Sequence, residues 1–403
     1  MVQDVSSRSS IRVAIVTNCL DLGGTTTFLC NLAGELVQRK IPVNVISFEK
    51  ENPLASDFQR LNIPVFCENQ QARIYEDRMT GVLRRLAEFK PTIVLANLGS
   101  ESFETLRYLP EGVFRIGIVQ SDDPGVYRGL PPYLPFLDAL GAVSKKIETE
   151  LKTIVSSQKT LVLYLPYGVP MPKVFSVRDE NNAPLRILYL GRLEQEQKRV
   201  RLFPTILEQL KATGMPFSWT IAGEGSEKAF LEQNMKSSPA QTVHFAGRVS
   251  YANVPQLLTE HDIFFLASDY EGLPLSLLEA MGCGLVPVVT DLPSGISEVI
   301  DETTGKKVAP QETADYAKAI FWLHEHRSEM GRMSQAAHEK VKMEFSVTAM
   351  TDRWLELFSR AETVDVSWPS RWTIHPILNV KGSLYFSRPM RALRRLRKKW
   401  QRV

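Results

Sequence analysis

Long apolar stretches are missing from this 403-residue sequence. A helix that crosses a bilayer needs about 18 consecutive apolar residues, and the first apolar run, 11–17, is short and interrupted by Arg12. The residues before it are polar and rich in serine, unlike a signal peptide. The overall mix, 44% hydrophobic and 23% charged, is that of a soluble globular protein. We therefore expect a cytoplasmic protein.

Cysteine and histidine are scarce. The four cysteines, Cys19, Cys30, Cys67 and Cys283, show no metal-ligand spacing, which favours free buried thiols over disulfides or a zinc site. The six histidines begin at His244 and have no paired ligand spacing. This distribution excludes any mechanism that needs a histidine base from the first half of the chain.

Acidic residues are absent from the segment Arg388–Val403, which holds eight basic residues. Because the whole chain carries a net charge of +3, the remainder carries −5. From Met390 onward the apolar side chains fall on one helical face, as in helices that lie on anionic membranes. We expect this tail to bind an anionic membrane surface, peripherally on its inner face. The alternatives are a solubilising tail or a nucleic-acid contact, and we expect no nucleic acid.

Short β-rich apolar runs alternate with helical patterns along both halves of the sequence. The first half opens with 11–17, then Gly23-Gly24 and a helical pattern, and the second opens with 185–190, then Gly191-Arg192. Continuous apolar strands alternating with helices predict parallel sheets covered on both faces. The expected fold is α/β, with two Rossmann-like doubly wound parallel-sheet domains facing a cleft, and with ligands at the carboxyl ends of the strands.

The same patterns predict the other elements. Further strands are expected at 43–48, 92–96, 114–119, 139–143, 217–222, 243–246, 263–266 and 286–290. Helices are expected at 144–154, 199–212, 274–281, 313–324 and 328–345, with Ser346 as the cap of a last helix.

Domain boundaries follow from composition. The stretch 167–182 is rich in proline, charge and asparagine, as linkers are. We expect an N-terminal domain at 1–168 and a C-terminal domain at 169–345. Residues 346–403 are expected to form a C-terminal helix that returns to the N-terminal domain and ends in the basic amphipathic tail.

The most informative segment is Ser268–Val289, SDYEGLPLSLLEAMGCGLVPVV. Glu271 falls in a turn after a strand, and Glu279 falls in the second turn of the following helix, so both can lie at one site. Their carboxylates are hydrogen-bond acceptors that can hold vicinal hydroxyls, as on a ribose or a hexose. The alternative is a solvated turn glutamate and an ordinary helix glutamate.

The start of that helix is a second feature of the segment. Pro274 fits the first helical position, where its missing N–H costs nothing. The free N–H groups of Gly272, Leu273 and Leu275 would then point from the helix N-terminus, which suits an anionic or hydroxyl-rich ligand.

At this point the sequence resembles the retaining family 4 glycosyltransferases of the GT-B fold, the glycosyl transferases group 1. Their signature is two glutamates separated by seven residues, and the flanking S-x-x-E-G and E-A-M-x-C-G-x-P-V-V match as well. The resemblance implies that Glu279 holds the donor ribose and that Glu271 lies by the hydroxyls of the transferred sugar. It also makes the N-terminal domain the acceptor side and the C-terminal domain the nucleotide-sugar donor side.

A basic pair follows the first strand of the second domain. The resemblance implies that Arg192 and Lys198 neutralise the negative charge that develops on the departing nucleotide diphosphate, as two cations aimed at it would. The alternative is a solvated surface pair. Because this pair already meets the phosphate charge, we expect no metal and no cofactor.

Two loops also resemble the family. Gly23-Gly24 looks like its N-terminal glycine loop, where small residues let a phosphate or an acceptor approach the backbone. A tight turn is the alternative. The turn that ends at Val249 resembles the loop that contacts the donor base, mainly through backbone.

The sequence departs from the family after the fourth strand of the first domain, where family members commonly carry a histidine. Here Gln120 and Ser121 are followed by Asp122 and Asp123. These aspartates are candidates for contacts with sugar or acceptor hydroxyls, and the alternative is a polar loop that caps the strand end. They do not form a D-x-D metal motif.

The resemblance implies a metal-independent, retaining transfer of a hexosyl-type sugar from a nucleoside diphosphate sugar to a hydroxyl acceptor. The acceptor is a glycan, a lipid-linked molecule such as an envelope precursor, or a small molecule. One alternative is a nucleotide-sugar epimerase of the same fold. Another is a non-catalytic, membrane-associated protein that binds nucleotide sugars.

Overall fold

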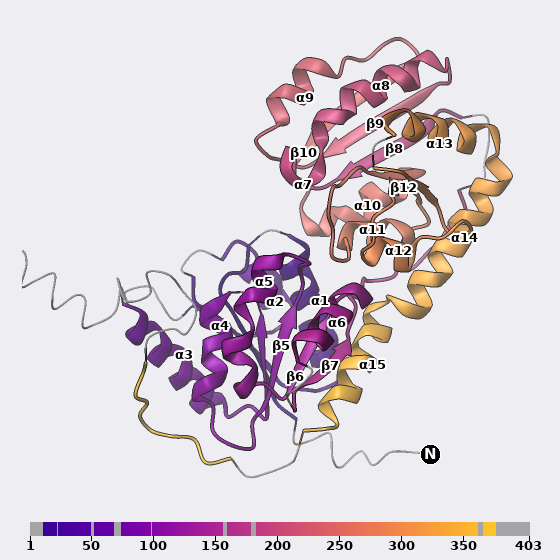
Figure 1. Cartoon of the computed structure of the whole chain (residues 1–403). Coiled ribbons are helices and arrows are strands. Elements are labelled where there is room, and N and C mark those ends of the chain that lie inside the picture. The colour runs from indigo at the N-terminus through magenta and orange to yellow at the C-terminus, as the bar shows by residue number, and fades with distance from the viewer. Residues whose placement is uncertain are drawn as a thin grey trace, which may run out of the picture. The chain divides into compact units, whose positions relative to one another are not determined.

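The computed structural model describes residues 11–21, 23–49, 52–67, 74–97, 99–155, 159–178, 183–310, 312–361 and 366–375. These residues form two compact units (Figure 1). Unit 1 takes its residues from Met1–Val143, Ile147–Leu165 and Thr351–Val403, and unit 2 from Ser144–Lys146 and Pro166–Met350. The boundary between the first and second domains, predicted after residue 168, thus falls three residues earlier. The end of the second domain, predicted at residue 345, falls five residues later. The tail Arg388–Val403 lies outside the described residues.

Unit 1 is built on a seven-stranded parallel sheet in the order β3-β2-β1-β4-β5-β6-β7. Its strands are β1 (Val13–Thr17), β2 (Val43–Ser47), β3 (Val65–Cys67), β4 (Ile93–Asn97), β5 (Phe114–Val119), β6 (Ala139–Ala142) and β7 (Leu161–Tyr164). Its helices are α1 (Gly24–Gln38), α2 (Ala55–Arg60), α3 (Tyr75–Phe89), α4 (Ser100–Thr105), α5 (Pro124–Gly129), α6 (Lys145–Ile154) and α15 (Val347–Phe358). Every residue of β1 and β4 is buried, because helices cover both faces.

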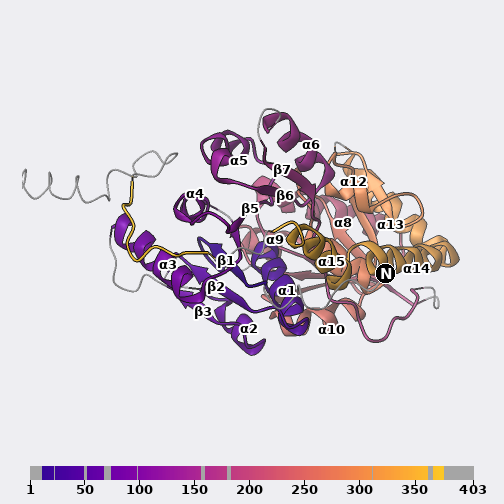
Figure 2. The ribbon, with the colours of Figure 1, turned by 90° about the horizontal axis from the view of Figure 1, so that it is seen from below.

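Two glycines let helices lie close to opposite faces of this sheet. The register of β5 and β6 directs Gly117 and Gly141 to opposite faces. A Cβ at Gly117 would lie 2.5 Å from the ring of Phe103 in α4, and one at Gly141 would lie 3.4 Å from the ring of Trp354 in α15. Helices α4 and α15 therefore cover different faces, which Figure 2 shows from below.

The C-terminal helix is part of the core of unit 1. Trp354 is fully buried, and its ring centre lies 6.3 Å from that of Phe28 in α1 and 5.8 Å from that of Phe358. At the start of α15 the Ser346 hydroxyl accepts the N–H of Ala349 at 3.2 Å, so the expected cap is confirmed.

Unit 2 is built on a six-stranded parallel sheet in the order β10-β9-β8-β11-β12-β13. Its strands are β8 (Leu185–Leu190), β9 (Phe217–Ala222), β10 (Gln241–Gly247), β11 (Ile263–Leu266), β12 (Val286–Thr290) and β13 (Lys306–Val308). Its helices are α7 (Gln195–Lys198), α8 (Phe203–Ala212), α9 (Lys228–Asn234), α10 (Val254–Thr259), α11 (Leu275–Gly282), α12 (Gly295–Val299), α13 (Thr313–Glu325) and α14 (Arg327–Glu344).

An aromatic cluster forms the core of unit 2 between the sheet and helices α8 and α13. Tyr189, Trp219 and Phe265 project from three strands and meet Phe203 of α8 and Tyr316 of α13, with ring centres 4.9 to 5.6 Å apart. Such pairs contribute about 0.5–1.5 kcal/mol each beyond the burial of their area. This packing holds β8 and β11, which carry the candidate site at their carboxyl ends.

The two doubly wound parallel sheets confirm the predicted α/β, Rossmann-like fold. All four cysteines lack a disulfide, as expected, although only Cys30 and Cys283 are buried, while Cys19 and Cys67 are partly exposed. Within the described residues, none of the helices has the length and apolar character that crossing a membrane requires.

Candidate active site

The carboxyl ends of β8, β9 and β10 meet at a group of glycines. The N–H of Gly223 donates to the carbonyl of Gly247 at 2.7 Å. A Cβ at Gly223 would lie 1.8 Å from the carbonyl oxygen of Gly191, and one at Gly225 would lie 2.2 Å from that of Leu193. Only glycine fits such close backbone approaches. Sequence reasoning missed Gly223 and Gly225, although Gly-Glu-Gly directly after an expected strand was a usable signal.

Lys198 and Glu271 form a shielded ion pair at this edge. Lys198 ends α7, in the segment after β8, and Glu271 lies in the turn after β11. The Nζ atom of Lys198 lies 2.5 Å from Oε1 of Glu271, and the side chains are only 13% and 6% exposed. The hydroxyl of Ser268 donates to the same oxygen at 2.6 Å. The fold therefore brings together two of the residues that the sequence singled out.

Arg192 lies beside this pair and is linked to it through Gln197. Its side chain is 58% exposed and pairs with Glu194 at 2.8 Å. Its Nη2 donates to Oε1 of Gln197 at 2.7 Å, and Nε2 of Gln197 donates to Oε2 of Glu271 at 3.4 Å. Gln197 is thus a site residue that the sequence analysis missed. The only available signal was its position next to Lys198.

Glu279 lies in the second turn of α11, as expected. Its carboxyl makes no hydrogen bond or ion pair with the described part of the chain, and burial raises the pKa of Glu279 to about 8. A half-buried carboxyl without a protein partner is costly to ionise, and this is typical of a functional position. Hydrogen-bond donors supplied by a ligand would stabilise its ionised form.

The loop before α11 presents backbone groups. The carbonyl of Gly272 accepts the N–H of Gly295 at 2.7 Å, which anchors the loop. The N–H groups of Gly272, Leu273 and Leu275 make no hydrogen bond with the described residues, as the sequence analysis expected. The sequence analysis placed Pro274 at the first helical position, and this prediction is wrong. Pro274 is the residue before α11, because its ψ of 115° is extended rather than helical.

Val249 lies two residues beyond the end of β10, where Gly247 turns the chain with a φ of +63°. It is half-buried. Its proposed proximity to a donor base stays a prediction.

In unit 1 the glycine loop follows β1. Gly23 is the N-cap of α1, which begins at Gly24. The φ of Gly23 is +151°, and a Cβ there would meet nothing within 4 Å. Its carbonyl accepts the N–H of Thr27 at 3.1 Å. The loop is therefore open above the helix N-terminus, as a site for a phosphate or an acceptor requires.

A neutral, buried hydrogen-bond network lies at the carboxyl ends of β1, β4 and β5. Asn97 donates through Nδ2 to the hydroxyl of Thr17 at 3.3 Å. Gln120, which follows β5 where the resemblance calls for a histidine, donates through Nε2 to Oδ1 of Asn97. The side chains of these three residues are all neutral.

The two candidate aspartates are engaged within their own loop. Asp123 accepts the N–H of Gly125 at 2.5 Å and caps α5. Asp122 accepts the hydroxyl of Tyr127 at 2.7 Å. Burial and this hydrogen bond raise the pKa of Tyr127. Capping is therefore the observed role of Asp123, although it caps a helix and not a strand end. Among the described residues, no group of three or more His, Cys, Asp or Glu side chains could hold a metal ion.

The sequence and the fold are both similar to those of known glycosyltransferases. Residues 184–326 match the family model described as Glycosyl transferases group 1. Glycogen synthase of Mycobacterium tuberculosis is 32% identical over 211 residues, which is 52% of this chain and 50% of that protein. The amylovoran biosynthesis glycosyltransferase AmsK of Erwinia amylovora is 34% identical over 185 residues, 43% of this chain and 45% of that protein. The chain thus spans about half the length of the curated relatives it matches.

Solved structures share the fold over most of the chain. A mutant of Staphylococcus aureus TarM, in complex with fondaparinux, alpha-GlcNAc-glycerol and UDP, has a TM-score of 0.70 at 13% identity, with 86% of this chain and 99% of that chain covered. Anabaena Alr3699/HepE in complex with UDP has a TM-score of 0.70 at 15% identity, with 87% and 100% covered. The chain therefore has the fold of the GT-B glycosyltransferases. Residues 184–326 are the part of the chain that matches the glycosyl transferases group 1 model.

Proposed function

We propose that this protein is a glycosyltransferase that moves a hexosyl-type sugar from a nucleoside diphosphate sugar to a hydroxyl acceptor, with retention of configuration and without a metal ion. One observation carries the proposal. At the carboxyl edge of unit 2, a shielded Lys198–Glu271 pair occurs together with the carboxyl of Glu279, which has no partner among the described residues.

The reaction needs positive charge where the diphosphate departs. The bond between the anomeric carbon and the diphosphate oxygen breaks, and a bond from the acceptor oxygen to the same carbon forms on the same face. The acceptor proton passes to the departing phosphate oxygen, so no protein base is required. In the proposal, Lys198 and Arg192 stabilise the developing negative charge, Glu271 orients the sugar, and Glu279 accepts the ribose hydroxyls.

Known proteins support the substrate classes. HepE has been solved with UDP-glucose, and the TarM complex contains UDP. A relative from Campylobacter jejuni, 24% identical over 229 residues, is an N-acetylgalactosaminyltransferase named for an undecaprenol-linked acceptor. A nucleotide-sugar donor and a glycan or lipid-linked acceptor are therefore the first classes to test.

A donor screen tests the binding half of the proposal. A ligand that binds only the native state raises the apparent stability, by about 2.7 kcal/mol at a concentration one hundred times its Kd. We expect one or more of the UDP-, GDP-, ADP- and dTDP-sugars to raise the melting temperature of the protein saturably. If none does so at millimolar concentration, the donor assignment is wrong.

Substitutions test the roles. Lys198→Met and Glu271→Gln should each lower kcat about 10²- to 10³-fold, the size of the loss when one preorganised oxyanion donor is removed from a hydrolase site. Lys228→Met is the matched control, because Lys228 pairs with Glu224 at 2.8 Å on the surface of the same unit. Folded Lys198 and Glu271 variants with wild-type turnover would contradict the assigned roles.

The remaining points have separate readouts. The anomeric configuration of the product, followed by NMR from an α-linked donor, should be α, and an inverted product would exclude retention. Turnover should persist in excess EDTA, and its loss would show a metal requirement. Incubation with the donor alone separates the transferase from an epimerase, which would convert the donor without acceptor. A non-catalytic binding protein would bind the donor but give no turnover with any acceptor.

We also propose that the tail Arg388–Val403 holds the protein at an anionic membrane. Its eight basic residues support this, because each contributes about 1 kcal/mol near such a surface. Full-length protein should sediment with vesicles that contain phosphatidylglycerol but not with neutral vesicles. A chain that ends at residue 387 should remain in the supernatant. Equal sedimentation of both chains would contradict the proposal.

A further inference from the structure

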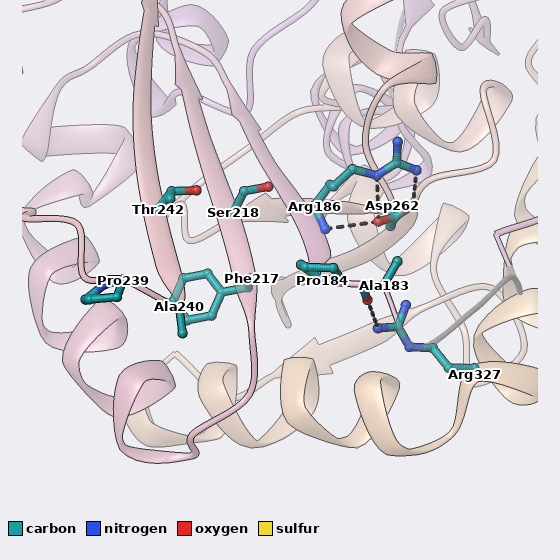
Figure 3. Close-up of a pocket in the computed structure, with 10 residues that line it drawn as sticks. All are labelled: Ala183, Pro184, Arg186, Phe217, Ser218, Pro239, Ala240, Thr242, Asp262 and Arg327. Atoms are coloured by element: carbon teal, nitrogen blue, oxygen red, sulfur yellow. Dashed lines mark hydrogen bonds and ion pairs between the residues drawn. The ribbon is translucent and has the colours of Figure 1, made fainter.

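A cavity of about 530 Å³ lies at the edge of the unit 2 sheet opposite the candidate active site (Figure 3). It borders the amino ends of β8, β9 and β10, whereas the active-site residues follow their carboxyl ends. β8 has six residues, so the two edges are roughly 20 Å apart at the usual rise per residue. The volume falls within the range of about 300–1,000 Å³ that is typical of small-molecule sites.

A row of polar side chains from three strands forms one wall of this cavity. Arg186 is in register with Ser218, and Ser218 is in register with Thr242. Side chains in register on neighbouring strands share one face of the sheet, and Figure 3 shows these three side by side. The hydroxyls of Ser218 and Thr242 make no hydrogen bond with the described residues.

Arg186 is paired with Asp262, the one residue of the cavity lining that carries a carboxylate. Its Nε and Nη2 donate to Asp262 at 3.0 and 2.6 Å, and its backbone N–H donates to the same carboxylate at 3.0 Å. Asp262 is 10% exposed, whereas Arg186 is 46% exposed. The other terminal nitrogen, Nη1 of Arg186, has no partner in the described part of the chain.

A second guanidinium reaches the cavity from α14. Arg327, the first residue of that helix, donates through Nη2 to the carbonyl of Ala183 at 2.9 Å and through Nε to the carbonyl of His324 at 3.2 Å. Its Nη1 likewise has no partner among the described residues. Burial lowers the pKa of Arg327, and the charge of Asp262 partly offsets this. Two cationic groups therefore face one carboxylate, and that carboxylate is already paired.

We propose that this cavity binds a phosphate group, either as inorganic phosphate or as a small phosphate ester. The four groups without partners, Nη1 of both arginines and the two hydroxyls, can all donate hydrogen bonds. The two hydroxyls could also accept hydrogen bonds from an uncharged polyol, but the two guanidinium groups can only donate and are positively charged, and the only carboxylate of the lining is committed to Arg186. A phosphate presents several charged acceptor oxygens, which match guanidinium and hydroxyl donors.

The test must separate this cavity from the candidate active site, which also attracts phosphates. We would measure binding by calorimetry in the Arg192→Ala/Lys198→Ala double variant, with inorganic phosphate and glucose 6-phosphate as probes. Glucose and potassium chloride at matched ionic strength are the controls. Phosphate and glucose 6-phosphate should bind saturably to this variant, and glucose should not. A stronger response to glucose 6-phosphate would identify a phosphate ester as the ligand, and equal responses would identify phosphate itself.

Variants of the cavity in that background complete the test. Arg327→Gln should weaken phosphate binding about tenfold, and Thr242→Val should weaken it several-fold while it keeps the shape of an exposed side chain. Arg332→Gln is the matched control, because Arg332 lies on the same helix, is 76% exposed and pairs with Glu329. The proposal is overturned if the double variant shows no binding beyond the chloride control, or if Arg327→Gln and Thr242→Val bind phosphate like the parent. Both results are independent of whether the protein transfers sugar.

Discussion

Replacing Glu279 with glutamine separates the stability of unit 2 from its proposed donor binding. Burial raises the pKa of Glu279 to about 8, against an ordinary 4.5. Below pH 4.5 the carboxyl is protonated in both the folded and the unfolded state. Between pH 4.5 and 8 the folded state keeps a proton that the unfolded state has lost, so stability falls as the pH rises. Above about pH 8 the loss is complete.

The size of this effect follows from the shift. A difference of 3.5 pKa units, at 1.36 kcal/mol per unit, sets an upper bound of about 4.8 kcal/mol. Part of the Glu279 surface still reaches solvent, which reduces the cost of the charge. We therefore expect Glu279→Gln, which is neutral at every pH, to be about 1–2 kcal/mol more stable than wild type at pH 9. The two proteins should be equally stable at pH 4.5.

Amide hydrogen exchange of peptides from unit 2, measured at both pH values, isolates this unit from unit 1. Glu208→Gln is the matched control, because Glu208 is 67% exposed on α8 and should give no pH-dependent gain. If the reasoning is right, Glu279→Gln should not stabilise unit 2 equally at pH 4.5 and pH 9. An equal gain in stability at the two pH values would refute it, since such a gain would not arise from a titrating carboxyl.

The same substitution should have the opposite effect on the donor. If ribose hydroxyls donate to the ionised carboxylate, binding must release a proton, so donor affinity should rise from pH 6 to pH 8. Calorimetry in buffers of different ionisation enthalpy measures that release. Glu279→Gln should bind the donor about tenfold more weakly, with no pH dependence. Wild-type binding without proton release would show that Glu279 does not accept from the donor in its charged form.

Three further substitutions test the scaffold by chemical unfolding. Gly223→Ala should lower the free energy of unfolding by about 3 kcal/mol or more, because its Cβ would overlap the backbone of a neighbouring strand end. Gly214→Ala should lower it by only about 1 kcal/mol, because Gly214 has a φ of +75° but open space around it. Equal costs would contradict the close approach. Trp354→Ala should cost about 3–5 kcal/mol, since the ring is fully buried in unit 1, and a cost below 1 kcal/mol would place α15 outside the core. Burial raises the pKa of Asp301, but hydrogen bonds from Thr303 and a lysine of α14 outweigh it and lower the pKa to about 2. Asp301→Asn should therefore cost about 1 kcal/mol at pH 7, and this cost should vanish as the pH falls from 3.8 to 2; a cost that persists at pH 2 would mean that the charge is not its cause.

The strands that the sequence predicted correctly share a physical cause. β5, β8, β9, β11 and β12 were expected to the residue, because each is a mainly apolar strand that is paired on both sides within its sheet. The three strands that were missed, β3, β7 and β13, are all edge strands. An edge strand pairs on one side only and can be short or polar: β3 has three residues, and β13 begins with two lysines. β7 does not fit this account, because it is an apolar run, LVLY, that the sequence analysis overlooked.

The site shows a similar division. The spacing of Glu271 and Glu279, together with the family resemblance, was enough to locate the loop and helix that carry them. The bridge through Gln197 depends on contacts between segments more than 70 residues apart, which no local pattern encodes. The capping role of Asp123 could have been predicted, because Asp-Pro at the start of a helix combines a preferred N-cap with a preferred first residue.

The two carboxyl edges also differ in charge in a way that matches the proposed chemistry. In unit 2, Lys198 and Arg192 are held in place by Glu271, Glu194 and Gln197, so cationic groups are positioned before a diphosphate arrives. In unit 1, the hydrogen-bonded residues at the corresponding edge include Thr17, Asn97 and Gln120, whose side chains are neutral. A departing diphosphate that takes the acceptor proton itself needs cations on the donor side and no base on the acceptor side. A glutamine in place of a histidine is therefore compatible with transfer. We expect the pH profile of kcat to show no ionisation near pH 6.5, where a histidine would titrate.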